Sequence, residues 1–182
     1  MNLENTKLRG RCHKLGHEMH MDTKVMPYKY IALHGFDAEK LVPHLFEDVV
    51  PEFYKRSQPG DFIVAGKNFA FGKPHSQGLI AIAALGLRLV CESMPFNSYR
   101  GAISRGIVCH RRCDGITEYV NDGDMVEFDF SKGEFHNLTT NFQKQYPPVH
   151  PDLLKMMLVG GMKPMLKKWG EANFSKTTGV TA

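Results

Sequence analysis

The chain has 182 residues, of which 42% are hydrophobic and 23% are charged, and its formal net charge is +4. This length fits one compact domain with a sizeable core. A membrane-spanning helix is not expected, because no apolar stretch approaches the roughly 20 residues that one requires. Nucleic-acid binding is not expected either, because the basic residues form isolated pairs instead of a run with interleaved aromatics.

The start of the chain and its cysteines favour a cytoplasmic protein. Residues 1–10 lack the apolar core of a signal peptide. The cysteines are expected to stay reduced, as thiols do in the cytosol; they are Cys12, Cys91, Cys109 and Cys113. We therefore expect a cytoplasmic location and no membrane partner.

Secondary-structure signals in the first 60 residues are short. Residues 1–30 are rich in polar side chains and contain glycine and proline, and we expect strand and loop there instead of helix. Between residues 37 and 56 the apolar residues have near-helical spacing, which Pro43 and Pro51 interrupt. This second segment predicts two short helices.

The following segment predicts one βαβ unit. Residues 62–65 form a short apolar run, residues 79–85 are apolar on almost every side before Gly86, and residues 88–92 (RLVCE) have an apolar centre between two charged residues. We interpret these segments as a strand, a helix and a second strand. Two strands joined by a helix within about 30 residues pair in parallel.

The second half predicts alternating elements and a helical tail. We expect a helix over residues 97–106, then a strand ending at His110, and a half-exposed strand over residues 125–130 between tight turns. A proline-stiffened linker follows, and Asp152 fits the N-cap of a helix that breaks at two glycines before another helical turn. We divide the chain into a domain of residues 1–140 and a helical tail of residues 141–182 that packs on it.

The loop of residues 66–72 is the first candidate site. A strand that leads through glycines into a helix exposes unpaired backbone N–H groups and the positive end of the helix dipole, which suit a carboxylate or a phosphate. Lys67 and Lys73 would add positive charge. An ordinary strand-to-helix turn explains the pattern equally well, because neither the Walker A spacing nor GxGxxG is present.

Longer segments resemble the small subunit of 3-isopropylmalate dehydratase, in the aconitase superfamily. GDFIVAGKNFAFG (residues 60–72) resembles that family's GDIIVAGKNFGCG. ESMPFNSYRGAISRGI (92–107) resembles AKSFARIFYRNAINIGL, and LLKMMLVGGMKPMLKK (153–168) resembles LLEILEAGGLxxYLKK. Further likeness in residues 8–30, 46–61 and 122–140 extends it over nearly the whole chain.

The resemblance implies a fold and a function. The fold would be α/β, the swivelling β/β/α domain of the aconitase superfamily, with a mixed sheet or barrel flanked by helices. The chain would be the small subunit of a hydro-lyase of leucine and other branched-chain amino acid biosynthesis. Its substrate would be a small hydroxy di- or tricarboxylate. A separate large subunit would hold a [4Fe–4S] cluster, and this chain itself would bind no cofactor and no metal. Whether the chain forms homo-oligomers stays open.

The reactive loop departs from the family pattern. Laid without gaps, the family's GSSRE falls on Gly72, Lys73, Pro74, His75 and Ser76. The serine that acts as base in the family becomes Lys73, and the arginine that grips a carboxylate becomes His75. The catalytic candidates are therefore Lys73, His75 and Ser76. Lys73 would need surroundings that favour its neutral form, histidine titrates close to neutral pH, and Ser76 would need a shifted register.

The same comparison supplies candidates for substrate binding. They are Asp22, Thr23, Lys24, His34, Lys67, Asn68, Gly72 and Arg100. The family's DTD motif becomes Asp22, Thr23 and Lys24, and His34 lies in the segment that helps to choose the substrate's side group. Arg100 matches the arginine of FYRNAIN, whereas the arginine of SFAR becomes Phe96. The remaining cations favour a polycarboxylate, because charges attract strongly in a water-poor cleft.

Three explanations of the altered loop remain open. The chain could serve the same dehydration with a new base, it could be a non-catalytic paralogue that acts as an anion-binding or regulatory subunit, or the large subunit could supply the base. A metal site at Cys109, His110 and Cys113 is disfavoured, because a four-ligand zinc site needs a second cluster. The histidines at positions 13, 17 and 20 are expected on the surface or in loops.

Overall fold

The computed structural model describes residues 6–73 and 75–174. Pro74, which takes the place of the family's second serine, lies outside the described residues, as do the last eight residues of the predicted tail. Among the residues that are described, no helix is long and apolar enough to cross a membrane.

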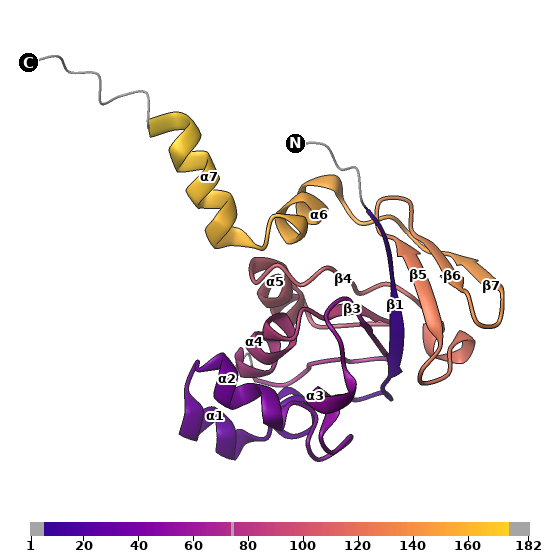
Figure 1. Ribbon diagram of the computed structural model, residues 1–182, viewed down its shortest axis with the longest axis horizontal. Helices are drawn as coiled ribbons and strands as arrows, with labels where there is room; N and C mark the ends of the chain where they lie inside the picture. The colour runs from indigo at the N-terminus through magenta and orange to yellow at the C-terminus, as the bar shows by residue number, and fades with distance from the viewer. Residues whose placement is uncertain (1–5, 74, 175–182) are drawn as a thin grey trace, which may run out of the picture.

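A mixed seven-stranded sheet organises the molecule, in the order β4-β3-β2-β1-β5-β6-β7 (Figure 1). Strand β1 lies at its centre and pairs in parallel with β2 on one side and antiparallel with β5 on the other. The parallel half continues through β3 and β4, and the antiparallel half through β6 and β7. The strands are β1 (Lys7–Lys14), β2 (Phe62–Ala65), β3 (Arg88–Cys91), β4 (Cys109–His110), β5 (Met125–Asp129), β6 (Glu134–Asn137) and β7 (Phe142–Gln145).

The two halves of the sheet bury their residues differently. All four residues of β2 are buried, as expected for a parallel strand covered on both faces. Most of β5 alternates between buried and half-buried positions, as a strand with one solvated face does. Helices α4 (Gln77–Ala84) and α5 (Phe96–Ser104) lie together on one side of the strands (Figure 1). The predicted parallel pairing of β2 with β3 and the α/β fold class are therefore confirmed.

The prediction of strand and loop for the first 30 residues was wrong after β1. A π-helical turn η1 (Met21–Val25) and helix α1 (Tyr28–His34) form there. Buried side chains anchor both, among them Val25 and Ile31, and Pro27 precedes α1 directly. Tertiary burial outweighs the weak local propensity of this segment.

Two short helices form in the next segment, as predicted. They are α2 (Ala38–Leu41) and α3 (Phe53–Arg56), with the 3₁₀ turn η2 (Val42–His44) after α2. A further 3₁₀ turn, η3 (Ile116–Tyr119), precedes β5.

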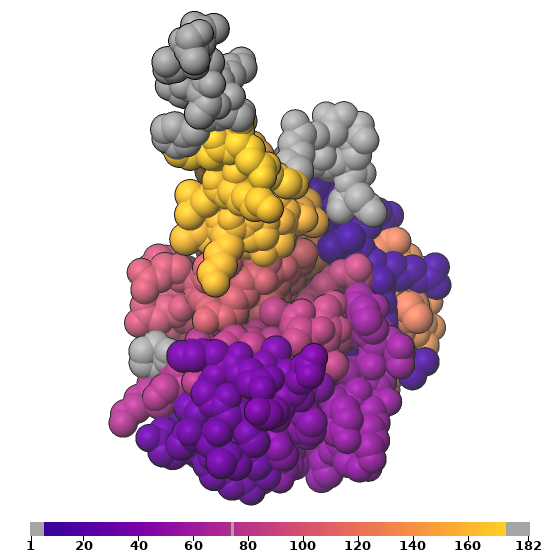
Figure 2. Space-filling view, turned by 60° about the vertical axis from the view of Figure 1, so that its left-hand side comes forward, coloured from indigo at the N-terminus to yellow at the C-terminus, as the bar shows by residue number. Residues whose placement is uncertain are grey.

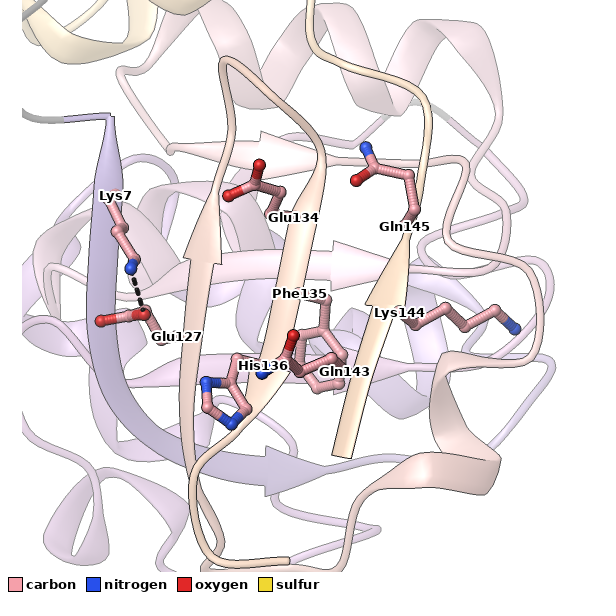
Figure 3. A pocket seen from close by; sticks show the side chains of 8 residues that line it. All are labelled: Lys7, Glu127, Glu134, Phe135, His136, Gln143, Lys144 and Gln145. Atoms are coloured by element: carbon pink, nitrogen blue, oxygen red, sulfur yellow. Dashed lines mark ion pairs between the residues drawn. The ribbon is translucent and has the colours of Figure 1, made fainter. Parts of the chain in front are cut away.

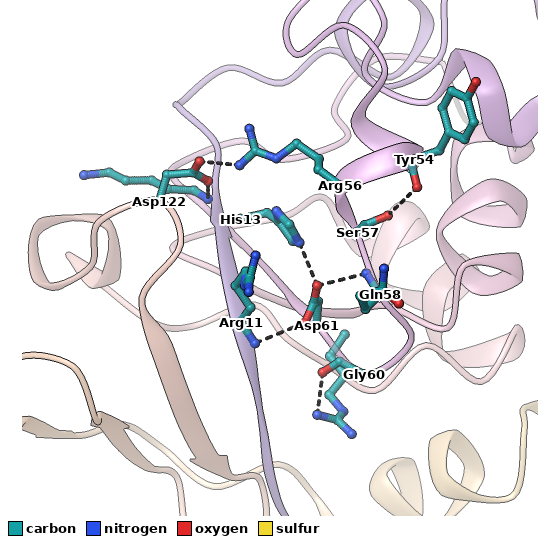
Figure 4. A network of polar contacts seen from close by, with 11 residues as sticks. Arg11, His13, Tyr54, Arg56, Ser57, Gln58, Gly60, Asp61 and Asp122 are labelled. Atoms are coloured by element: carbon teal, nitrogen blue, oxygen red, sulfur yellow. Dashed lines mark hydrogen bonds and ion pairs between the residues drawn. The ribbon is translucent and has the colours of Figure 1, made fainter.

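A buried polar network ties β1 to the turn before β2 (Figure 4). Asp61 accepts hydrogen bonds from the backbone N–H of Arg11 and of Gln58 at 3.1 and 2.9 Å. The His13 ring lies 2.9 Å from the same carboxylate and is 1% exposed. The expectation that His13 lies on the surface or in a loop was therefore wrong: it is a core residue of β1.

Residues 142–145 of the predicted helical tail form strand β7 of the sheet, and the helices of the tail are α6 (Pro151–Leu158) and α7 (Met162–Phe174). Asp152 is not the N-cap, because the helix begins at Pro151 and the side chain of His150 accepts the hydrogen bond from the Asp152 N–H. The predicted break is confirmed at Gly160 and Gly161, whose φ angles are +92° and +100°. Helix α6 buries Leu154 and Met157, whereas α7 projects away from the sheet (Figure 1).

Candidate functional site

The loop that links β2 to α4 is held against the N-terminal segment. Backbone N–H groups of Glu18 and Met21 donate to the carbonyls of Lys67 and Phe71 at 2.8 and 2.7 Å. In the opposite direction, Ala70 donates to Met19 at 2.7 Å. This ladder outside the main sheet fixes the path of the loop from Lys67 to Phe71.

Two glycines of the loop make room for two histidines. A Cβ on Gly66 would lie 2.4 Å from Nδ1 of His17, and a Cβ on Gly72 would lie 2.4 Å from Nε2 of His20. Nδ1 of His17 also accepts a hydrogen bond from the Lys67 N–H at 3.0 Å. The sequence analysis did not predict that Gly66 and Gly72 make room for these two histidines, although two glycines in one short loop were a signal of close contacts.

His75 and Asp22 form a pair at the end of the loop. Nδ1 of His75 lies 2.8 Å from Oδ1 of Asp22, and the two side chains are 33% and 11% exposed. Because an ionised carboxylate only accepts, Nδ1 carries the proton in this contact. The Tyr28 ring flanks His75, with ring centroids 5.7 Å apart. The pair has the geometry of an oriented general base.

A cleft of about 410 Å³ opens between the start of α4 and α5. The loop contributes His75 and Ser76, whereas α5 and the residue after it contribute two guanidinium groups, from Arg100 and Arg105. Leu79 and Met162 add apolar surface, and no described lining residue is a carboxylate. Figure 2 shows α7 (yellow) rising above the rest of the chain, with the N-terminal helices (purple) at the opposite end. The cleft is thus suited to an anion.

Comparison with known proteins identifies the family. No family model matches the chain. The 3-isopropylmalate dehydratase small subunit 1 of Thermotoga maritima is 34% identical over 165 residues, which cover 90% of this chain and 96% of that protein. The small subunit 2 of Archaeoglobus fulgidus is 32% identical over 166 residues, 91% of this chain and 98% of that protein. The chain belongs to the family of 3-isopropylmalate dehydratase small subunits.

A solved structure of this dehydratase family shares the fold. The crystal structure of 3-isopropylmalate dehydratase from Methanocaldococcus jannaschii aligns with a TM-score of 0.83 at 29% identity, covering 93% of this chain and 99% of that one. From the same organism, the isopropylmalate/citramalate isomerase small subunit is 32% identical over 162 residues, 88% of this chain and 94% of that protein. The resemblance, the swivel-domain fold and membership of a hydro-lyase subunit family are confirmed.

Several of the predicted catalytic and substrate-binding residues do not line the cleft. Thr23, Lys24 and Lys73 are exposed. The Asn68 side chain donates to Oε1 of Glu18 at 2.7 Å and thereby holds the loop. These residues, with Lys67 and Gly72, lie in or beside the loop instead of lining the cleft, and their roles toward substrate stay predictions.

His34 lies in a different environment from the cleft. Its ring stacks with those of Tyr30 and His44, at centroid distances of 5.8 and 5.5 Å. Glu47 accepts a hydrogen bond from the Tyr30 hydroxyl and lies 2.6 Å from Nδ1 of His44. The contribution of His34 to the choice of substrate also stays a prediction.

The cysteines of this subunit do not form a metal centre. Burial raises the pKa of the Cys12 thiol to about 12 and raises those of Cys91, Cys109 and Cys113 well above their usual range. Within the described residues, no three histidine, cysteine, aspartate or glutamate side chains are grouped to hold a metal ion. A cluster held by three cysteines requires such a group, so the described residues do not fit a [4Fe–4S] cluster.

A second hollow lies over the antiparallel half of the sheet (Figure 3). It has a volume of about 310 Å³ and carries charges of both signs. Nζ of Lys7 lies 2.8 Å from Oε1 of Glu127, so part of this charge is already compensated. Its side chains do not converge on a common point (Figure 3), and the cleft beside His75 is the stronger site.

Proposed function

We propose that the chain is the small subunit of a hydro-lyase that removes water from a hydroxy di- or tricarboxylate and adds it back. 3-Isopropylmalate is the first substrate to test, which would place the enzyme in leucine biosynthesis in the cytoplasm. The observation that carries the proposal is the cleft in which the Asp22–His75 pair meets guanidinium groups without any lining carboxylate. Family membership supports the same reaction class.

The partner in this proposal is a large subunit that carries the [4Fe–4S] cluster. The cluster would supply Lewis-acid chemistry, and it is assigned to the partner because the described residues of this chain include no group of side chains that could hold a metal ion. The residues of this chain bind, orient and exchange protons with the substrate. Formation of the complete site therefore requires both subunits.

In the proposed reaction, Arg100 binds a substrate carboxylate through paired N–H donors. Nε2 of His75 takes the proton from the carbon next to a carboxylate, and the electron pair of that C–H bond forms the C=C bond. The hydroxyl takes a proton from solvent as its C–O bond breaks and leaves as water, and Nε2 returns its proton to solvent to restore the base. Asp22 holds Nδ1–H and stabilises the imidazolium that forms. The Ser76 side chain makes no capping hydrogen bond with α4, so its hydroxyl can donate to the substrate.

The alternative is a non-catalytic paralogue that binds an anion and regulates a partner. One observation favours it: Lys73, at the position of the family's catalytic serine, is exposed and does not line the cleft. The two proposals differ in turnover but share anion binding.

Reconstitution with the large subunit separates them. The complex is assayed with isopropylmalate, citramalate and other malate derivatives by the ultraviolet absorbance of the conjugated unsaturated product. We expect turnover of at least one substrate, and we expect His75→Gln to lower kcat about 100-fold with the subunits still associated. Binding of these acids without turnover of any of them would favour the non-catalytic alternative.

A further inference from the structure

We propose that Arg105 is a second carboxylate-binding residue of the cleft and, with Arg100, makes it selective for substrates that present two carboxylate groups. The inference rests on the proposed function and deepens it. Arg105 follows the last residue of α5 and lines the same cleft as His75 and Arg100. Neither the sequence pattern nor the predicted site pointed to it.

The spacing along α5 brings both arginines to the cleft. Asn97, Gly101 and Arg105 are four residues apart and form one row on the helix surface. Arg100 and Ser104 form the adjacent row, and all five residues line the cleft. Two guanidinium groups from neighbouring rows can therefore reach one small molecule from different sides.

A backbone hydrogen bond holds Arg105 over the surface of α5. Its Nη1 donates to the carbonyl oxygen of Gly101 at 3.0 Å, so the guanidinium folds back over the helix. A Cβ on Gly101 would lie at an ordinary contact distance of 3.7 Å from this nitrogen, but only 3.0 Å from Cδ1 of Leu79. Glycine inside a helix is destabilising relative to alanine, and the close approach of Leu79 on α4 is a physical reason for its presence.

The family pattern has different residues at both positions. Where YRNAINIGL has asparagine and isoleucine, this chain has Gly101 and Arg105. The first change opens space beside the helix and the second fills part of it with a cation. The two changes fit together as one rebuilt element of the cleft.

The charge of Arg105 is incompletely compensated within the protein. Burial lowers the pKa of Arg105, so part of its hydration shell has been removed. Within the described part of the chain neither Arg105 nor Arg100 has an ion-pair partner, and one hydrogen bond uses one of five N–H donors. A carboxylate offsets such desolvation through short, charge-assisted hydrogen bonds.

The tail adds an apolar residue, Met162, to the wall of the cleft. A Cβ on Gly161 would lie 2.4 Å from the Ser104 carbonyl oxygen, and a Cβ on Gly106 would lie 2.4 Å from the Gly160 carbonyl carbon. This close backbone contact between the tail and the end of α5 places Met162 in the cleft wall. An apolar substituent between two carboxylates would find Leu79 and Met162.

The test compares a diacid with its half-amides. Calorimetry with the complex of both subunits measures the dissociation constants of 3-isopropylmalate and of each half-amide, in which one carboxylate is a neutral amide. We expect Arg105→Ile to weaken binding of the diacid about tenfold or more, with Arg105→Lys in between. The wild type should bind the diacid more tightly than the half-amides. In Arg105→Ile, the ratio of the dissociation constant of one half-amide to that of the diacid should fall to about one. Arg112→Ala removes an exposed arginine outside the cleft and should change neither value.

The outcomes separate this inference from the proposed function. Unchanged binding and an unchanged diacid preference in Arg105→Ile would overturn the role of Arg105, while wild-type turnover would leave the proposed function standing. An equal loss in Arg112→Ala would show a bulk charge effect and would also overturn it. A wild-type complex that neither binds nor converts the diacid would overturn both. Arg105→Lys provides the same comparison if the isoleucine variant does not fold.

Discussion

Replacing Asp22 by asparagine tests whether His75 is an oriented general base. The carboxylate lies 2.8 Å from Nδ1 of His75 and is 11% exposed, so little water competes with the contact. An amide at this position can donate to Nδ1, which moves the ring proton to Nε2. The nitrogen that faces the substrate would then be unable to accept a proton.

The size of the effect follows from the contact that is lost. A hydrogen bond to a charged group contributes about 1.5–3 kcal/mol, and each 1.36 kcal/mol corresponds to a factor of ten, so kcat should fall roughly 10- to 160-fold. KM should change by less than about threefold, because Asp22 does not line the cleft. The loss should appear in the transition state and not in substrate binding.

The assay is steady-state turnover of the two-subunit complex across a range of pH. Asp152→Asn is a matched control, because Asp152 also faces a histidine, with Oδ2 3.7 Å from Nδ1 of His150, but both side chains are exposed and far along the chain from the loop. A purely structural role of Asp22 would lower thermal stability and leave the pH profile of kcat in place. Wild-type kcat and an unmoved pH profile in Asp22→Asn would refute the assignment of His75 as the base.

Four further variants test the loop, the sheet and the core. His75→Gln should lower kcat about 100-fold, whereas Lys73→Ala should mainly raise KM because Lys73 is exposed; a collapse of kcat only in Lys73→Ala would reverse the two assignments. Gly10→Ala should lower the free energy of unfolding by about 1–3 kcal/mol in urea denaturation, because its Cβ would lie 2.2 Å from a backbone carbonyl oxygen. Burial lowers the pKa of His110 below 6.5, so below that pH the unfolded chain binds more protons and the free energy of unfolding falls on acidification. His110→Gln should remove this part of the pH dependence, and an unchanged slope would contradict it.

Local pattern predicted the parallel half of the sheet well. The apolar run at β2, the helix before Gly86 and the run at β3 are contiguous and strongly apolar, so burial and local preference agree. Strand β7 was missed because half-buried and exposed residues alternate along it, and only its pairing with β6 defines it. Helix α1 was missed for a related reason: much of it is exposed, and one deeply buried residue, Ile31, anchors it.

The part of the site that was predicted is the part that could be compared with the family's motifs. Comparison of motifs named His75, Ser76 and Arg100, and the structure brings all three to one cleft. The comparison of motifs could not identify Arg105, because this residue departs from the family pattern. Its role is indicated only by the fold, which brings Arg105 to the same cleft as His75. Nor could spacing along the chain pair Asp22 with His75, since 53 residues separate them.

The changes in this chain redistribute charge around a retained backbone. Relative to the family pattern, guanidinium groups are absent at His75 and Phe96 and one is gained at Arg105. The proposed base moves from the position of Lys73 to the oriented ring of His75, which already lines the cleft. Arg105 is partly buried without an ion-pair partner among the described residues, which costs stability unless an anion offsets it. Its position in the same cleft as the new base and the exposed Arg100 therefore argues that the cleft still binds a multiply charged acid, with the carboxylates held from α5 instead of from the loop.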